Sequence, residues 1–247
     1  MVAFLIGGGW DAGARHLVYR PFLDAAGKAP VVACVVLDEG DGLVQAARWA
    51  EALLSVAPCT PLPVLVALGE VLDVAALDDA DAVLVCGGLT PAYATALAPA
   101  APAIYEWLER EPRPFAGFSA GAAVAARQAL VGGWRIDGVP VCPEDAAEDL
   151  DEVTVVAGLG LVPFTVDVHA AQWGTVNRLV SAVRVGLVPC GLAIDENTMI
   201  SIDEGTATVA GLGVAHWVSK SDNGVRIRTW AAGDEIELAT QMKDRSS

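Results

Sequence analysis

The chain has 247 residues, 54% of them hydrophobic, and its 15 Lys and Arg against 31 Asp and Glu give a formal net charge of −16 at pH 7. The apolar fraction excludes an intrinsically disordered chain, and the negative charge would repel nucleic acids and anionic membranes. We therefore expect a globular fold in a single domain over residues 1–247, with neither a nucleic acid nor a membrane as a partner.

The longest stretch without a charged residue, 82–105, contains three prolines and two glycines, which excludes a membrane-spanning helix. Residues 1–6 lack a basic leader and are too short for the apolar part of a signal peptide, so we expect a cytoplasmic protein. The five cysteines are odd in number, widely spaced and without a CxxC pair. They predict free thiols rather than disulfides or a zinc site.

In the first half of the chain, short apolar runs alternate with segments of helical periodicity. The predicted strands are 2–6, 31–37, 82–86 and 115–118, and the predicted helices are 43–56, 91–110 and 120–130. Continuous apolar runs of this length are typical of strands that are covered on both faces. The alternation predicts a three-layer α/β fold with a doubly wound, mostly parallel sheet.

The second half of the chain has a different pattern. Segment 144–152 holds six carboxylates in nine residues and predicts a solvated loop or a helix start. After residue 195, segments 198–202, 207–218 and 225–230 alternate or carry β-branched residues, with turn sequences at 203–205 and 221–224. These segments predict C-terminal antiparallel hairpins beside the main sheet.

The strongest chemical signal is Gly117-x-Ser119-x-Gly121, which follows an apolar strand and precedes an Ala-rich segment. A nucleophile elbow requires this context, because its Ser sits on a sharp strand-to-helix turn that only small neighbours allow. The N–H of Ala120 would then stabilise an oxyanion. Gly88 follows the strand 82–86, and its N–H is the candidate for the second oxyanion donor.

A serine nucleophile needs a base, and the chain has three histidines. His16 lies among charged residues in an early helix and is predicted to be on the surface. His216 lies in an alternating strand, where a packed or hydrogen-bonded histidine is the ordinary case. His169 follows a Gly/Pro-rich apolar run, and we take it as the candidate base.

Three carboxylates are candidates for orienting this histidine. Asp195 and Glu196 form a pair at the end of a predicted strand, and Asp167 precedes His169 by two residues. The sequence does not choose among them. A solvated turn is the alternative interpretation of the Asp195-Glu196 pair.

Gly7-Gly8-Gly9-Trp10-Asp11-Ala12 matches G-x-G-x-x-A after a strand, and Asp38 ends the next strand. This arrangement also occurs in dinucleotide-binding folds. Trp10 and Asp11 would crowd and repel a pyrophosphate, so we do not expect a nucleotide.

Taken in chain order, these motifs resemble those of the dipeptidase E and cyanophycinase family of serine peptidases, which has the class I glutamine-amidotransferase-like fold. The resemblance rests on the following segments: Gly7-Gly8-Gly9, Gly87-Gly88, residues 117–122, Asp167-Val168-His169 and residues 191–198. It implies a Ser119 nucleophile, a His169 base and Glu196 as third member. It also implies a small peptide substrate with an N-terminal Asp or an Asp–Arg isopeptide bond, no metal or cofactor, and a homodimer.

The chain departs from this family where the substrate is recognised. Family members place arginines in an R-x-R-x-x-R pattern after the catalytic His, and Trp173, Thr175 and Arg178 stand at those positions here. Neither Trp nor Thr replaces the bidentate grip of Arg on a carboxylate. Arg178 is therefore the candidate for holding a substrate carboxylate, with Thr90 and Asp167 as further candidate substrate-binding residues.

The prediction is a serine hydrolase that cleaves a short peptide through an acyl-enzyme on Ser119. One alternative is an esterase-like α/β hydrolase that uses Ser119, Asp195 and His216. The other is a catalytically inactive relative that keeps the fold as a binding module.

Overall fold

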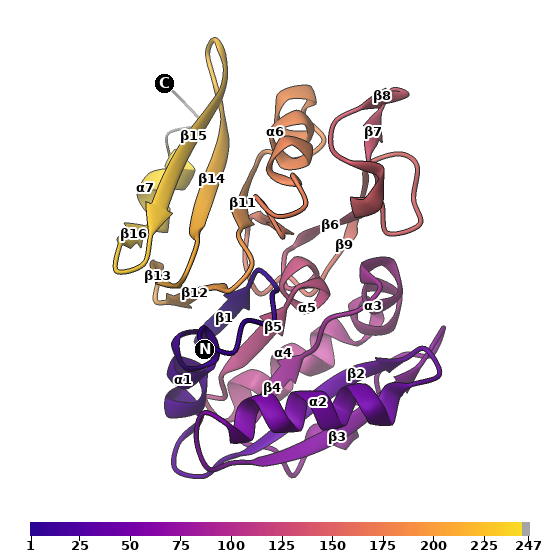
Figure 1. Ribbon diagram of the computed structural model, residues 1–247, viewed down its shortest axis with the longest axis vertical. Coiled ribbons are helices and arrows are strands. Elements are labelled where there is room, and N and C mark those ends of the chain that lie inside the picture. Colours follow the sequence, from indigo (N-terminus) through magenta and orange to yellow (C-terminus); the bar gives the residue numbers. More distant parts are fainter. Residues whose placement is uncertain (244–247) are drawn as a thin grey trace.

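The centre of the protein is an eight-stranded sheet, seen in the computed structural model, which describes residues 1–243; residues 244–247 of the expected domain lie outside it. The strand order is β16-β13-β12-β1-β5-β4-β2-β3 (Figure 1). Neighbours from β1 to β3 are parallel, and β12, β13 and β16 add to the β1 edge in antiparallel fashion. The strands are β1 (Ala3–Ile6), β2 (Val31–Asp38), β3 (Thr60–Ala67), β4 (Ala82–Val85), β5 (Phe115–Phe118), β12 (Thr198–Asp203), β13 (Thr206–Gly211) and β16 (Glu235–Glu237).

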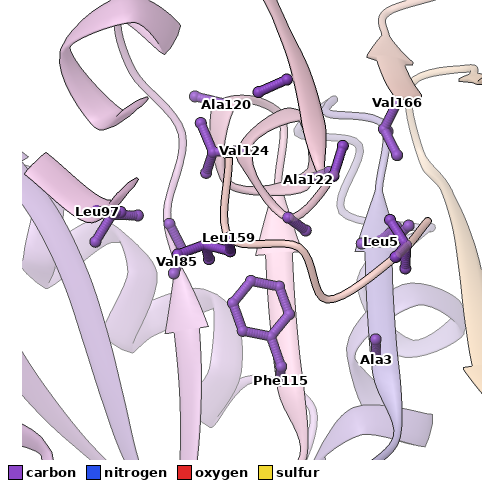
Figure 2. Packing of buried hydrophobic residues seen from close by; sticks show 14 of the residues in the cluster. Ala3, Leu5, Val85, Leu97, Phe115, Ala120, Ala122, Val124, Leu159 and Val166 are labelled. Atoms are coloured by element: carbon purple, nitrogen blue, oxygen red, sulfur yellow. The ribbon is translucent and has the colours of Figure 1, made fainter. Parts of the chain in front are cut away.

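Helices cover both faces of this sheet. Phe4 and Ile6 of β1 pack into a core with α1 (Arg15–Ala26) and α2 (Gly42–Leu54). Leu5 points to the opposite face, where α3 (Thr90–Leu97), α4 (Ala101–Arg110) and α5 (Ala120–Val124) pack. Figure 2 shows Leu5 and Phe115 on this second face, below α5. The period of two along each strand therefore gives one apolar core per face, and the predicted doubly wound α/β fold is confirmed.

A second sheet stands beside the first, with the order β10-β11-β14-β15. Its strands are β10 (Thr165–Val168), β11 (Cys190–Ile194), β14 (Val214–Ser221) and β15 (Gly224–Ala231), and α6 (Val176–Val185) packs against it. The C-terminal antiparallel strands are present, as predicted. Smaller elements are the pairs β6 (Gln128–Gly132) with β9 (Thr154–Ala157) and β7 (Arg135–Ile136) with β8 (Val139–Pro140), the 3-10 turns η1 (Val74–Leu77), η2 (Ala98–Ala100) and η3 (Glu144–Ala146), and α7 (Leu238–Lys243).

The predicted helix over residues 120–130 is wrong beyond its first turn. Helix α5 ends at Val124, and the chain turns into β6 four residues later. The carbonyls of Val124, Ala125 and Ala126 accept N–H bonds from residues 159–161. Those carbonyls would otherwise have accepted the next N–H groups of the helix, so the irregular segment 159–161 ends it.

Two further segments were predicted as single elements but are divided. Residues 207–218 form β13 and β14, which lie in different sheets, because the chain bends at Gly211 with φ of 119°. Residues 91–110 form α3, η2 and α4, with Pro99 and Pro102 at the breaks. Strand β3 was not predicted, because Pro61 and Pro63 are unusual in a strand; both are tolerated here because β3 is the edge strand of its sheet. Within residues 1–243, no helix has both the length and the apolar character to cross a membrane.

Candidate active site

Ser119 sits on a strained turn between β5 and α5. Its φ and ψ are 51° and −111°, a conformation that non-glycine residues rarely adopt. The flanking glycines allow this turn to pack tightly. A Cβ on Gly117 would lie 2.4 Å from the carbonyl oxygen of Gly121, and a Cβ on Gly121 would lie 2.1 Å from that of Val85. Strand β5, the tight turn at Ser119 and helix α5 thus follow one another in the order that the sequence predicts.

A serine, a histidine and a carboxylate lie in one hydrogen-bonded row. Ser119 Oγ is 2.7 Å from Nε2 of His169, and Nδ1 of the same ring is 2.7 Å from Oε1 of Glu196. A carboxylate at Nδ1 selects the tautomer with a proton on that nitrogen, so Nε2 is free to accept the Ser119 hydroxyl proton. The row can therefore activate a serine as a nucleophile.

The backbone at the end of β1 holds all three segments of this row. Ser119, His169 and Asn197, the residue after Glu196, have φ values of 51°, 56° and 58°. The carbonyls of residues 6–8 accept the N–H groups of these three residues in turn, at 2.8, 2.9 and 2.7 Å. Three consecutive carbonyls thus fix three left-handed residues from two different sheets.

Burial and charge act in opposite directions on His169. The ring is only 6% exposed, and desolvation lowers its pKa below the ordinary 6.5, against the hydrogen bond and charge of Glu196, which raise it. The net direction is downward. A lowered pKa favours the neutral imidazole, which is the form that a general base needs.

The other candidates for this row lie elsewhere. Asp195 accepts the N–H groups of Ala171 and Val214, both at 3.0 Å, and so braces the backbone rather than the histidine. His216 is on β14 and its Nδ1 is 2.8 Å from Thr229 Oγ1. The esterase-like arrangement of Ser119, Asp195 and His216 is therefore not assembled. His16 is exposed, as predicted.

Arg178 and Asp167 are buried against each other, which corrects their expected role as substrate-binding residues. They are 4% and 1% exposed. Arg178 Nε and Nη2 donate to the two carboxylate oxygens of Asp167 at 3.0 and 2.7 Å, and Nη1 donates to the carbonyls of Gly133 and Ala146. A guanidinium occupied in this way braces β10, α6 and η3 and does not face the pocket.

Thr90, predicted as a substrate-binding residue, does not line the pocket. Its side chain is buried, and its N–H donates to Glu148 Oε2 at 3.0 Å. The residues just before it, Gly87 and Gly88, do reach the pocket. A Cβ on Gly87 would lie 3.4 Å from Cβ of Ser119, so this loop passes close to the nucleophile. Ala120 opens α5, where N–H groups lack acceptors within the helix.

A pocket of about 880 Å³ opens over Ser119 and His169, and its wall is strongly acidic. Among residues 1–243, seven carboxylates line it: Glu39, Glu144, Asp145, Glu148, Asp149, Asp151 and Glu196. Arg48 is the one Lys or Arg of the described chain in this lining, and its guanidinium lies 3.5 Å above the ring of Trp10. The acidic segment 144–152, predicted to be a solvated loop or a helix start, begins with η3 and is largely exposed, and five of its carboxylates line this open pocket. Burial raises the pKa of Glu148, although its bonds from Thr90 oppose the rise.

Sequence reasoning missed Arg48 and Trp134, which also lines the pocket. Arg48 stands on the exposed side of α2, like many ordinary surface arginines, and no motif marks it. Its stacking partner Trp10 belongs to the Gly-rich turn and was the one available signal.

No protein-family model matches the chain, and no curated protein matches it in sequence. The solved structures that are similar in fold include two peptidases. One is a peptidase from an acI-B1 Actinobacterium, with a TM-score of 0.65 and 18% identity over 96% of both chains. The other is a candidate peptidase E from Listeria monocytogenes EGD-e, with a TM-score of 0.56 and 16% identity over 86% of this chain and 98% of that one. The chain therefore has the overall fold of these two proteins.

Proposed function

We propose that this protein is a serine-type peptidase that hydrolyses short peptides through an acyl-enzyme on Ser119. The observation that carries the proposal is the row of Ser119, His169 and Glu196, joined at 2.7 Å twice, at the floor of a pocket. The fold shared with two peptidase structures supports the same reaction class.

The reaction follows from this geometry. Ser119 Oγ bonds to the scissile carbonyl carbon while Nε2 of His169 takes the hydroxyl proton. Glu196 stabilises the imidazolium, which then gives that proton to the departing amine as the C–N bond breaks. Water attacks the acyl ester while His169 takes its proton. His169 then returns this proton to Ser119 Oγ as the ester C–O bond breaks and the acid leaves. The N–H groups of Gly88 and Ala120 are the proposed donors to the oxyanion in both steps.

The charges of the pocket favour a zwitterionic peptide. Seven carboxylates in the lining complement a free ammonium group, and Arg48 complements a carboxylate on the α2 side. Since Arg178 is buried on Asp167, we propose that an N-terminal Asp side chain is not the preferred recognition element. A screen of dipeptides with neutral, basic and acidic first residues measures this preference through kcat/KM.

Labelling with a fluorophosphonate probe tests the proposal against the inactive binding module. We expect the native protein to be labelled and the Ser119→Ala variant to remain unlabelled. His169→Gln is expected to abolish labelling, while the matched variant His216→Gln keeps it. A folded native protein that resists the probe, or one that loses labelling only with His216→Gln, would contradict the proposed mechanism.

A further inference from the structure

Trp173 covers the face of the histidine ring. The centroids of the His169 and Trp173 rings are 3.8 Å apart and the two planes are inclined by only 8°. Trp173 is 41% exposed and lines the same pocket, whereas His169 is 6% exposed. The indole thus stands between the imidazole and the solvent.

Hydrogen bonds to His169, Asp195 and Glu196 hold the turn that carries Trp173. Its own N–H donates to the carbonyl of His169 at 2.9 Å. The side-chain oxygen of the preceding Gln172 accepts the N–H of Glu196 at 2.9 Å, and the N–H of Ala171 donates to Asp195. The turn is therefore hydrogen-bonded both to His169 itself and to Glu196, the residue that bonds its imidazole.

The β1 turn also approaches the ring closely, at Gly8. A Cβ on this glycine would lie 2.2 Å from Cε1 of His169. The imidazole is therefore confined by the β1 turn, by Ser119 and Glu196 along its edge, and by the indole on its face. Such confinement holds Nε2 in line with the serine oxygen, which matters because small misalignments are costly in catalysis.

We propose that Trp173 is a positioning residue that aligns the imidazole of His169 and stabilises its protonated form by stacking. The inference rests on the proposed function, because its catalytic value requires His169 to take a proton from Ser119. An aromatic face attracts a cation placed over it, so the indole favours the imidazolium that forms in each half-reaction. The other ionisable groups that act on the ring are Glu196, Asp167 and Arg178, and none of them contributes an aromatic face.

NMR of protein labelled at histidine Cε1 tests the stack without reference to activity. The chain has three histidines, and His169→Gln assigns the signal of interest. We expect this signal to be shifted upfield by the indole ring current and to lose that shift in Trp173→Leu. The pKa of His169 should fall by roughly half a unit in Trp173→Leu and stay near the native value in Trp173→Phe. Trp134→Phe, a second tryptophan of the pocket, is the control and should leave the signal unchanged.

Labelling of Ser119 by a fluorophosphonate then links the stack to catalysis. We expect Trp173→Leu to slow labelling about tenfold on the pH plateau and Trp173→Phe to restore most of the rate. An unshifted His169 signal, or a pKa that is unchanged or higher in Trp173→Leu, overturns the inference even if the native protein is labelled normally. Failure of the native protein to label refutes the hydrolase instead, and the NMR titration still decides whether the stack forms.

Discussion

Replacing Arg178 by Met tests whether this residue stabilises the fold or binds the substrate. The guanidinium donates twice to Asp167 and also to the carbonyls of Gly133 and Ala146, all inside the protein. Removing one partner of a buried ion pair leaves an uncompensated charge and typically costs about 3–5 kcal/mol. For a chain of this size, the melting temperature should fall by roughly 2–4 °C per kcal/mol, or roughly 6–20 °C in all.

Urea denaturation of Arg178→Met, of Asp167→Asn and of the double variant Arg178→Met/Asp167→Asn measures this cost. We expect the double variant to be more stable than the sum of the single changes predicts, because it buries no unpaired charge. A single variant that unfolds within about 1 kcal/mol of the native protein but has a raised KM would refute the reasoning. That result would return Arg178 to the substrate-binding role that the sequence suggests.

Three more predictions concern the site. Since burial holds the pKa of His169 below 6.5, fluorophosphonate labelling should decline only as the pH falls through that lower value; a midpoint above 6.5 would contradict this. The same lowered pKa predicts that the folded protein loses stability as the pH falls from 6.5 through the pKa of folded His169, because the unfolded chain binds the proton first. Gly121→Ala places a Cβ 2.1 Å from the Val85 carbonyl oxygen and should cost about 1–3 kcal/mol in urea denaturation; an unchanged midpoint would disprove the packing argument. Arg48→Gln should raise KM about tenfold for peptides with a free carboxylate but not for their amides; equal effects on both would exclude the proposed contact.

The layered fold was predictable because the residues within each strand and helix are enough to indicate that element. Strands β1, β2, β4 and β5 of the parallel part are short apolar runs, and burial on both faces requires such runs whatever the partner strands are. The edge strand β3 is half exposed and carries two prolines, so it lacks this local signal. The end of α5 was not predictable, because carbonyls 124–126 are taken by a segment more than thirty residues away. Local helix propensity does not include that competition.

The candidate site was predictable only in part, because contacts between distant segments decide which side chains reach it. Ser119 is recognisable from the glycines at 117 and 121. Asp195 and Glu196, in contrast, are adjacent carboxylates, and the sequence alone does not tell which of them contacts the histidine. The fold separates them, since Asp195 caps two backbone N–H groups while Glu196 reaches the imidazole. The sequence also assigned Arg178 to the substrate, because a lone helical arginine shows neither its burial nor its partner.

The Gly-rich turn after β1 has a structural role that its sequence pattern does not predict. Read as G-x-G-x-x-A, it suggests a phosphate cradle, yet its carbonyls bind the backbone of Ser119, His169 and Asn197. A left-handed residue costs of order 1–3 kcal/mol and persists only where its surroundings fix it. Carbonyls 6–8 supply one such fixing bond to each of the three. Because these bonds join backbone atoms, their trace in the sequence is the absence of side chains at Gly7, Gly8 and Gly9. A Cβ at these positions would lie 2.3 Å from the Asp195 carbonyl oxygen, 2.2 Å from Cε1 of His169 and 2.5 Å from Oδ1 of Asn197, respectively.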